Sequence, residues 1–310
     1  MKGIFMKAPA KINLYLHITG KREDGYHFLD TLIAFTDIYD ELEITPADKF
    51  SLEISGEFAH LVENNDSNIV SRACKMMADE CGASNNFSIK LVKNIPVGAG
   101  LGGGSADAAA TLILLNEILG AGFSKEKLAG IGVKLGADVP IFINRHAAFV
   151  SGIGEKINDT GNLPELYAIL VYPNKFLSTK DVFVKFSKDN FGDAHSPAGR
   201  ELGRGSLSNW EHENPNPLQV EEGIHNDWLS FLKSKRNDLE NTAIEFLPEI
   251  KLLLADLAAL KGCHFSRMSG SGSTCFAIFT DKNQAETATA ELKSKSPGLW
   301  IKQVKVVQEY

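Results

Sequence analysis

Five glycines fall within the seven residues 98–104, inside the segment PVGAGLGGGS at residues 96–105. Glycine loses more backbone freedom on folding than any other residue, so this density is destabilising unless it serves a purpose. The residues before it are typical of a strand, and the alanine-rich residues after it are typical of a helix. Backbone amides without neighbouring side chains, next to a helix N-terminus, can bind phosphate oxygens. The segment predicts a phosphate-binding loop, with a flexible turn that binds nothing as the alternative.

Two well-known phosphate loops fit this segment incompletely. Gly98, Gly100 and Gly103 match the dinucleotide pattern G-x-G-x-x-G, but that pattern requires a strand after the helix, and here a second helix is expected. The Walker spacing is also met, but Gly104 stands where the Walker loop needs lysine. A nucleotide kinase of a third kind would need its cation from elsewhere in the chain, and Lys11 in the segment PAKIN is a candidate.

The remaining patterns predict alternating strands and helices. Strands are expected at residues 11–18, 31–44, 87–92, 147–150, 167–172, 263–268, 274–280 and 299–307. Helices are expected at residues 68–81, 105–119, 124–135, 179–186, 239–260 and 281–294. Asp66 and Ser67 are expected to cap the first helix, Pro248 to divide the fifth, and residues 138–140 to form a fixed loop. Residues 188–223 are polar and without periodicity, which favours a surface loop or a mobile insertion.

Composition excludes several classes of function. A chain of 310 residues with 44% apolar residues can form a sizeable core, and its length favours two domains. A net charge of −7 argues against binding to nucleic acid or to an anionic membrane. The four cysteines lack the C-x-x-C spacing of zinc and redox sites. Without a signal segment or an apolar run long enough to cross a membrane, the protein is expected to be soluble and cytoplasmic.

Three separated segments resemble one family of small-molecule kinases. Residues 9–14 (PAKINL), 96–106 (PVGAGLGGGSA) and 268–274 (MSGSGST) are similar, in order and spacing, to the superfamily of galactokinase, homoserine kinase, mevalonate kinase and phosphomevalonate kinase. Residues 25–27 (GYH), 135–140 (LGADVP) and 237–240 (NDLE) resemble the branch that acts on a cytidine-diphosphate-linked methylerythritol in the non-mevalonate isoprenoid pathway. The resemblance covers residues 8–280, apart from residues 188–223.

The resemblance implies a fold and a reaction. It implies an α+β fold with a glycine-rich phosphate loop, an ATP-binding domain at residues 1–160, a substrate-binding domain at residues 161–310, and an active site in the cleft between them. ATP would phosphorylate the 2-hydroxyl of the methylerythritol unit, giving the 2-phosphate and ADP. The alternatives are a superfamily kinase for homoserine, mevalonate or a sugar, a nucleotide-binding protein without catalysis, and a dinucleotide-dependent oxidoreductase.

The resemblance also implies roles for individual residues. Asp138 would accept the substrate proton, with Lys11 beside it; a turn residue and an exposed strand lysine are the structural alternatives. The nucleotide would be bound by Pro96, Val97, Gly98, Ala99, Gly100, Leu101, Gly102, Gly103, Gly104, Ser105 and Ala106. The substrate would be bound by Asn13, Tyr26, His27, Thr179, Phe183, Gly270 and Gly272, although Thr179 could instead be a helix cap and Phe183 a core residue.

The same resemblance bears on metals and partners. Mg²⁺ is expected to arrive with the ATP phosphates, so no protein ligand is assigned to it. Ser105 and Asp107 are expected to lie near the metal, but neither is assigned as a ligand. The partner is expected to be a small molecule that carries a cytidine diphosphate group. Neither a nucleic acid nor a membrane is expected as a partner, and the protein is expected to be a monomer or a homodimer.

Overall fold

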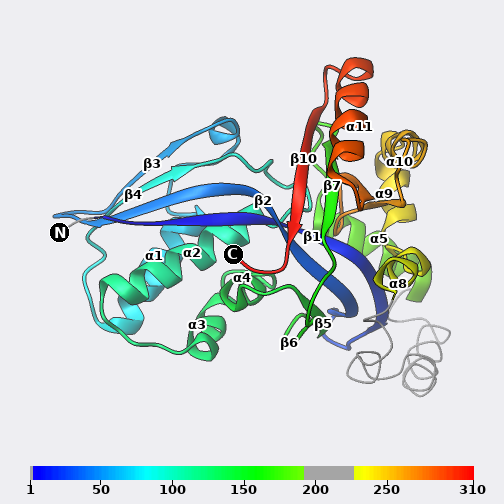
Figure 1. Cartoon of the computed structure of the whole chain (residues 1–310). Coiled ribbons are helices and arrows are strands. Elements are labelled where there is room, and N and C mark those ends of the chain that lie inside the picture. The colour runs from blue at the N-terminus through cyan, green and yellow to red at the C-terminus, as the bar shows by residue number, and fades with distance from the viewer. Residues whose placement is uncertain (1–2, 192–226) are drawn as a thin grey trace.

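The fold is built on two long antiparallel strands at the start of the chain (Figure 1). The computed structural model describes residues 3–191 and 227–310. Strand β1 (Ile4–Lys21) pairs with β2 (His27–Pro46) along its whole length, from Ile4 opposite Ile44 to Lys21 opposite His27. Three register shifts interrupt the pairing, and two of them lie on either side of Lys11 and Asn13. Such bulges change the direction of nearby side chains and are common beside functional sites.

The other strands extend this pair into one ten-stranded sheet, in which the main order is β3-β4-β2-β10-β7-β9-β8. Their bounds are β3 Ser51–Ser55, β4 Phe87–Val92, β5 Ala148–Gly152, β6 Lys156–Asp159, β7 Leu166–Tyr172, β8 Phe265–Met268, β9 Cys275–Phe279 and β10 Trp300–Val307. The last strand, β10, pairs with β2 on one side and β7 on the other, so the end of the chain joins the two halves of the sheet. The expected boundary near residue 160 falls between β6 and β7 and stays a prediction.

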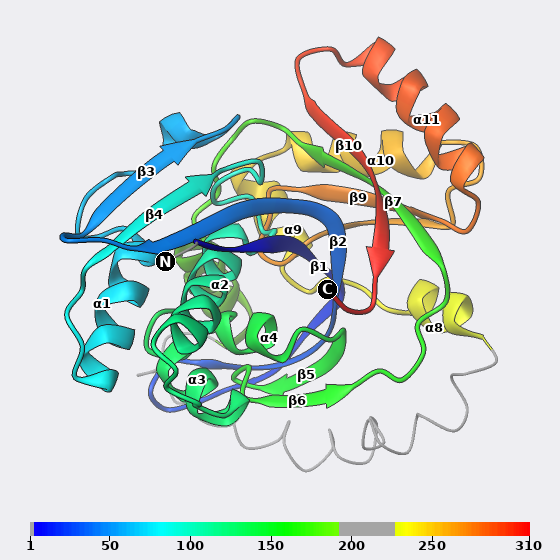
Figure 2. The same cartoon turned by 60° about the vertical axis from the view of Figure 1, so that its left-hand side comes forward.

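The helices form two groups, one against each half of the sheet (Figures 1 and 2). The first group is α1 (Ile69–Cys81), α2 (Gly103–Ile118), α3 (Lys125–Gly132) and α4 (Val139–Asn144), with a short 3₁₀ helix at Ala59–Leu61. The second group is α5 (Thr179–Phe191), α8 (Trp228–Ser234), α9 (Glu240–Phe246), α10 (Glu249–Ala258) and α11 (Lys282–Lys295). None of the helices in the described ranges combines the length and hydropathy that crossing a membrane requires.

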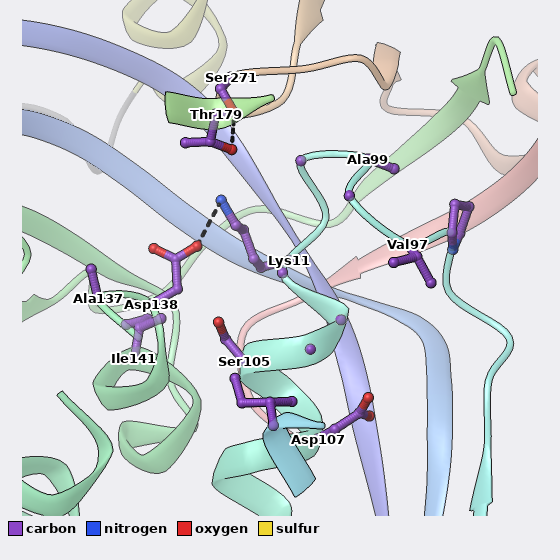
Figure 3. Close-up of a pocket in the computed structure, with 18 of the residues that line it drawn as sticks. Lys11, Val97, Ala99, Ser105, Asp107, Ala137, Asp138, Ile141, Thr179 and Ser271 are labelled. Carbon is purple, nitrogen blue, oxygen red and sulfur yellow. Dashed lines mark hydrogen bonds and ion pairs between the residues drawn. The ribbon is translucent and has the colours of Figure 1, made fainter. Parts of the chain in front are cut away.

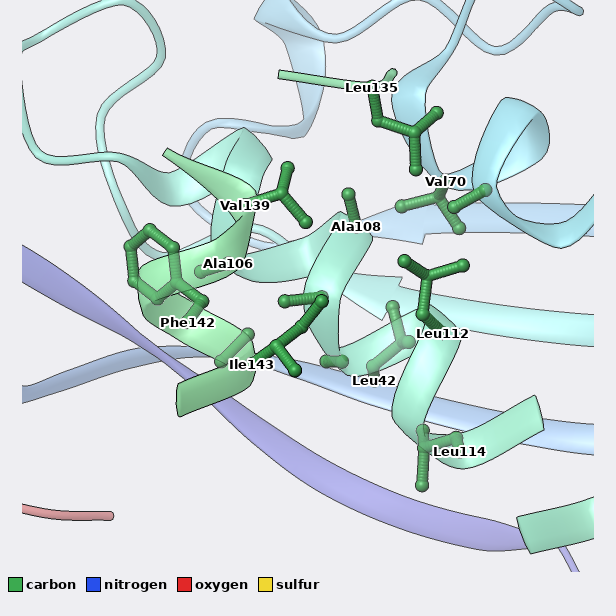
Figure 4. Close-up of a cluster of buried hydrophobic side chains, with 14 of the residues drawn as sticks. Leu42, Val70, Ala106, Ala108, Leu112, Leu114, Leu135, Val139, Phe142 and Ile143 are labelled. Atoms are coloured by element: carbon green, nitrogen blue, oxygen red, sulfur yellow. The ribbon is translucent and has the colours of Figure 1, made fainter. Parts of the chain in front are cut away.

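Helix α2 is the centre of the first group (Figure 4). Most of its residues are buried, as expected for a helix enclosed by other elements, and it packs against α1, α4, β1 and β2. Ala108 and Leu112 of α2 lie with Val139 and Phe142 of α4 in one buried cluster. Through this packing the start of α2 and the start of α4 are held at fixed positions beside β1.

Most of the predicted elements are confirmed, with local corrections. The expected loop at residues 138–140 is confirmed at Asp138, which lies in the turn before α4, and is wrong at Val139 and Pro140, which begin that helix. Proline is tolerated in a first helical turn, where its missing N–H has no intrahelical partner. The cap of α1 is Asn68, whose Oδ1 accepts a hydrogen bond from the Val70 amide at 2.8 Å, and not Asp66 or Ser67. Helix α5 continues to Phe191, so residues 188–191 are helical, and the rest of the predicted insertion lies outside the described residues.

Candidate active site

A cavity of about 570 Å³ lies where the two halves of the sheet meet the glycine loop (Figure 3). Its walls come from β1, from the loop before α2, from the start of α4, from the start of α5 and from the turn between β8 and β9. The sequence-predicted site residues that line it are Lys11, Asn13, Pro96, Val97, Gly98, Ala99, Gly100, Gly102, Gly103, Gly104, Ser105, Asp138, Thr179, Phe183 and Gly270. Residues predicted from five separate segments of the chain therefore line one cavity.

The glycines of the first loop are required by both conformation and packing. Gly100 and Gly102 have φ angles of +80° and +71°, in the left-handed region that side chains disfavour. A Cβ on Gly100 would lie 2.4 Å from the carbonyl oxygen of Ser269, and a Cβ on Gly102 would lie 2.8 Å from the ring of Phe142 and 2.9 Å from Lys11. The loop therefore packs directly against neighbouring backbone and side chains, and no other residue type fits at these two positions.

The start of α2 is suited to an anion. Gly102 precedes the helix and supplies no side-chain cap, so the first amides of α2 have no side-chain acceptor. Gly103, Gly104 and Ser105, which carry these amides, line the cavity. Free N–H groups and the positive end of the helix dipole favour a phosphate at this place. The loop has no room for a Cβ at Gly100 or Gly102, and the helix that follows it has no side-chain cap. This combination is suited to bind the phosphates of a nucleotide.

Lys11 and Asp138 form an ion pair at the cavity wall (Figure 3). Lys11 Nζ lies 3.4 Å from Asp138 Oδ2; the lysine side chain is 6% exposed and the aspartate side chain 45% exposed. Nζ also donates to Asn13 Oδ1, and the Lys11 amide donates to the Leu101 carbonyl at 2.9 Å, which ties β1 to the glycine loop. Asp138 precedes α4 without capping it, so its carboxylate is available to the cavity. The structure therefore brings the two predicted catalytic residues together.

The turn between β8 and β9, residues 269–274, forms a second glycine loop against the first. Ser269 Oγ donates to the Gly100 carbonyl at 3.0 Å, and the Thr274 amide donates to the Ala99 carbonyl at 3.1 Å. Both loops therefore belong to one hydrogen-bonded wall.

This second loop also reaches the ion pair and α5. A Cβ on Gly270 would lie 3.3 Å from Asn13 Oδ1 and 3.5 Å from Lys11 Nζ. Ser271 Oγ lies 2.8 Å from Thr179 Oγ1, at the start of α5. The space beside Gly270 that a side chain would fill is therefore bordered by Asn13 and Lys11 of β1.

The residues predicted for the cytidine lie around the turn between β1 and β2 and on α5. The ring centres of His27 and Phe183 are 5.3 Å apart, and Tyr26 is 59% exposed. Burial, and to a lesser extent the charge of Lys21, lowers the pKa of His27, so its imidazole is neutral near pH 7. Its Nε2 atom is buried without a hydrogen-bond partner among the described residues. This aromatic group therefore contains one buried polar atom without a partner among the described residues.

Some predicted residues do not line the cavity. Leu101 and Ala106 are each 1% exposed and belong to the hydrophobic core. Tyr26, His27 and Gly272 are near the lining residues but are not among them. In the described part of the chain, no three His, Cys, Asp or Glu side chains gather in a way that could hold a metal ion.

A buried charge cluster behind the first glycine loop was not predicted. Lys93 Nζ donates to Asp107 Oδ2 at 2.7 Å and also to Asp40, whose other oxygen accepts from the amides of Asn94 and Ile95 at 2.6 and 2.9 Å. Asp107 is 2% exposed, and burial raises its pKa to about 7 even though Lys93 opposes the shift. The cluster holds both ends of the loop on β2. An aspartate within a strand, where Asp is rare, was the signal that the sequence offered.

Comparison with known proteins agrees with the resemblance. Residues 68–146 match the GHMP kinases N terminal domain, and residues 201–298 match the GHMP kinases C terminal domain. A protein of Anaplasma marginale named 4-diphosphocytidyl-2-C-methyl-D-erythritol kinase is 38% identical to this chain, and the match covers 99% of this chain and 100% of the relative. A protein of the same name from Rhizobium etli is also 38% identical, and the match covers 98% of this chain and 95% of the relative.

Solved structures give the same result. A crystal structure of 4-(cytidine 5'-diphospho)-2C-methyl-D-erythritol kinase is 30% identical, with a TM-score of 0.71 over 97% of this chain and 99% of the other. A homoserine kinase from Cytophaga hutchinsonii, at 18% identity, has a TM-score of 0.71 over 100% and 96% of the two chains and shows the shared fold. The expected two-domain kinase fold is confirmed. The chain belongs to the 4-diphosphocytidyl-2-C-methyl-D-erythritol kinase family of the GHMP kinases.

Proposed function

We propose that this protein phosphorylates the 2-hydroxyl of 4-diphosphocytidyl-2-C-methyl-D-erythritol with ATP, giving the 2-phosphate and ADP in the non-mevalonate isoprenoid pathway. The observation that carries the proposal is the Lys11–Asp138 ion pair, which faces a cavity between two glycine loops. The near full-length similarity to kinases with this substrate in their names supports the choice of acceptor.

The first glycine loop is proposed to bind the nucleotide. ATP supplies the phosphoryl group that is transferred. The free amides at the start of α2, carried by Gly103, Gly104 and Ser105, would donate to phosphate oxygens, and the helix dipole favours their charge. The cavity continues to the apolar side chains of Val62 and Ile69, which would contact the nucleoside. Leu101 and Ala106 would act through the core, by fixing the loop, rather than by contact.

Lys11 and Asp138 are proposed to carry out the transfer. The Asp138 carboxylate would accept the proton of the substrate hydroxyl as the oxygen attacks the phosphoryl group. The Lys11 ammonium, held by Asn13, would stabilise negative charge on the transferred group in the transition state. Both tasks need fixed positions, and the pairing of β1 with the loop through Leu101 provides them.

The remaining predicted residues are proposed to bind the cytidine end and its diphosphate. Tyr26 and Phe183 would stack on the base, an interaction of about 1–3 kcal/mol per base in nucleic-acid systems. Neutral His27 offers one donor and one acceptor to the cytosine edge. Asn13, Thr179, Gly270 and Gly272 would orient the methylerythritol and diphosphate groups.

Mg²⁺ and the cellular location complete the proposal. Mg²⁺ would bind chiefly through ATP phosphates and water, a coordination that needs few protein carboxylates. We place the enzyme in the cytoplasm, because the four cysteines are free thiols and disulfides are rare there. Its partners would be small molecules, and its state a monomer or a homodimer.

The test is a comparison of phosphoryl acceptors. Purified protein with Mg²⁺ and ATP is supplied with 4-diphosphocytidyl-2-C-methyl-D-erythritol, mevalonate, homoserine or galactose, and ADP release is measured. We expect ADP release with the cytidine compound alone. ADP release with only one of the other acceptors would support a kinase activity but reject the proposed cytidine site. No ADP release with any acceptor would reject the catalytic proposal.

A further inference from the structure

The segment at residues 237–240 (NDLE) connects α8 to α9, and its first side chain is almost completely buried. Asn237 is 5% exposed. Its Nδ2 donates to the carbonyl oxygens of Met268 at 2.8 Å and Gly270 at 2.7 Å, and its Oδ1 accepts from the Leu239 amide at 2.9 Å. The side-chain amide therefore donates one hydrogen to the end of β8 and the other to the second glycine loop, and its oxygen accepts from the residue before α9.

The same segment is fastened to β1. The Leu16 amide donates to the Arg236 carbonyl at 3.0 Å, and the Asp238 amide donates to the Leu16 carbonyl at 2.8 Å. Asp238 Oδ2 accepts from the Ile18 amide at 2.8 Å. The segment thus spans from the strand that carries Lys11 to the loop that contains Gly270.

The second glycine loop needs such a support. Gly270 and Gly272 have φ angles of +59° and +94°, and glycine at these positions leaves the backbone free to adopt other conformations. The Asn13 amide donates to Ser269 Oγ at 3.2 Å, so a shift of this loop would also disturb β1. Because a Cβ on Gly270 would lie only 3.5 Å from Lys11 Nζ, the position of Gly270 decides how much space the reacting groups have.

We propose that Asn237 is a positioning residue for phosphoryl transfer: it fixes Gly270 and Ser271 against Lys11 and the first glycine loop, so that the substrate hydroxyl rather than water meets the phosphoryl group. The proposal rests on the proposed function. In productive transfer, the bond from the γ-phosphorus to its bridging oxygen breaks and a bond to the substrate oxygen forms, with the proton taken up by Asp138. In hydrolysis, water takes the place of the substrate hydroxyl and inorganic phosphate is formed.

The test uses Asn237→Asp, which keeps the acceptor for Leu239 and removes the donors to Met268 and Gly270. Because misplacement by about 1 Å can lower a rate about 10²-fold, we expect a fall in kcat of that order. The KM for ATP should change less than kcat, because the Asn237 side chain bonds to Met268, Gly270 and Leu239 and not to the first glycine loop itself. The ratio of ADP formed to phosphorylated product, which is one for the wild type, should rise. Asn237→Ala provides a second variant if the aspartate prevents folding.

Ser266→Ala is the matched control. Ser266 lies on β8, two residues before Met268, and its Oγ donates at 2.9 Å to the Leu254 carbonyl on α10, away from the loop. This variant also loses one side-chain hydrogen bond, but we expect it to retain the wild-type kcat and an ADP to product ratio of one. A general loss of stability in this region would affect the control and the test variant alike.

Amide hydrogen exchange tests the positioning without turnover. The Gly272 amide donates to Ser269 at 3.0 Å and the Thr274 amide to Ala99, so both should exchange faster in the Asn237 variants. If the wild type makes no product, the proposed function fails, and exchange alone then decides the positioning: faster exchange supports it and unchanged exchange overturns it. If the wild type is active, folded variants with wild-type kcat and a ratio of one overturn the inference.

Discussion

At the scale of single residues, the site depends on two groups in different environments. Lys11 is buried between Asn13 and Asp138, while the Asp138 carboxylate opens to the cavity. Asp138→Asn keeps the size of the side chain and removes its ability to accept a proton, so we expect kcat to fall about 10²–10⁴-fold. Nucleotide binding, measured by calorimetry with a non-hydrolysable ATP analogue, should persist. Activity near the wild-type value would remove Asp138 from the mechanism.

Lys11→Ala should also abolish turnover. Among the described residues, Lys11 is the one cation that forms an ion pair with Asp138, and the substitution removes it. Lys7→Ala is the control, since Lys7 lies on the same strand with Nζ 3.9 Å from the centre of the Tyr39 ring, and is not a lining residue of the cavity. The Lys7 variant should keep the wild-type kcat. Equal losses in both variants would point to damage to β1 rather than to a role for the Lys11 charge.

His27 provides a pH test of the cytidine site. Burial lowers its pKa below the ordinary value of 6.5, so the folded protein holds it neutral and its protonation opposes folding. As pH falls through this lowered pKa, the ring gains a proton and loses its acceptor, and the KM for the cytidine substrate should rise. NMR titration of the His27 ring gives the pKa directly. A value at or above 6.5, or a KM independent of pH, would contradict this role.

At the scale of elements, the cluster of Asp40, Lys93 and Asp107 joins β2, the end of β4 and the start of α2. Asp40 Oδ1 accepts hydrogen bonds from two backbone amides, while Asp107 Oδ1 has no partner among the described residues. The two carboxylates outweigh burial and raise the pKa of Lys93. Burial, with a smaller contribution from Asp40, raises the pKa of Asp107 to about 7, so Asp107 is protonated below that pH.

This cluster predicts that the free energy of unfolding decreases as the pH rises. Between the ordinary pKa of 3.8 and the folded value of about 7, the native state binds more protons than the unfolded state. The free energy of unfolding should therefore decrease from pH 4 to pH 7, by up to about 1.4 kcal/mol per pH unit from this group, and then level off. Asp107→Asn should remove that slope in urea titrations, whereas Asp79→Asn on the exposed face of α1 should retain it. An unchanged slope in Asp107→Asn would contradict the assignment.

The contact between the two glycine loops predicts the effect of a single methyl group. In Gly100→Ala, the new Cβ would collide with the Ser269 carbonyl in a backbone conformation that alanine disfavours. We expect a loss of more than about 1 kcal/mol of stability and of most activity. Gly130→Ala in α3 is the control, because nothing lies within 4 Å of its Cβ, and it should keep full activity. The melting temperature and kcat of both variants test this prediction, and wild-type values for Gly100→Ala would contradict it.

At the scale of the whole molecule, local sequence patterns predicted single strands, helices and loops better than they predicted contacts between distant segments. Alternation located β4 at residues 87–92 without error, and the glycine segment marked the loop before α2. The motif resemblance brought Lys11 and Asp138 to one site, where the structure has them 3.4 Å apart. The insertion of β10 between β2 and β7 was not predictable in this way, because strand order depends on packing between segments far apart in the chain.

The same limit explains the missed site features. Asp40 and Lys93 meet because β2 and β4 pair, and neither residue stands in a motif. Asn237 stands in a motif, but its partners Met268 and Gly270 belong to another element, so only the fold shows what its amide does. The loop prediction failed at Val139 and Pro140 because a short helix of six residues gives little periodicity.

The phosphorus NMR spectrum of the product is the most direct test of the account. The protein is incubated with Mg²⁺, ATP and 4-diphosphocytidyl-2-C-methyl-D-erythritol, and the product spectrum is compared with that of the same reaction using Asp138→Asn. We predict one new phosphomonoester on the 2-hydroxyl, formed in equal amount with ADP by the wild type and absent with the variant. Phosphate on another oxygen, ADP without a new ester, or an equal yield from the variant would contradict the account.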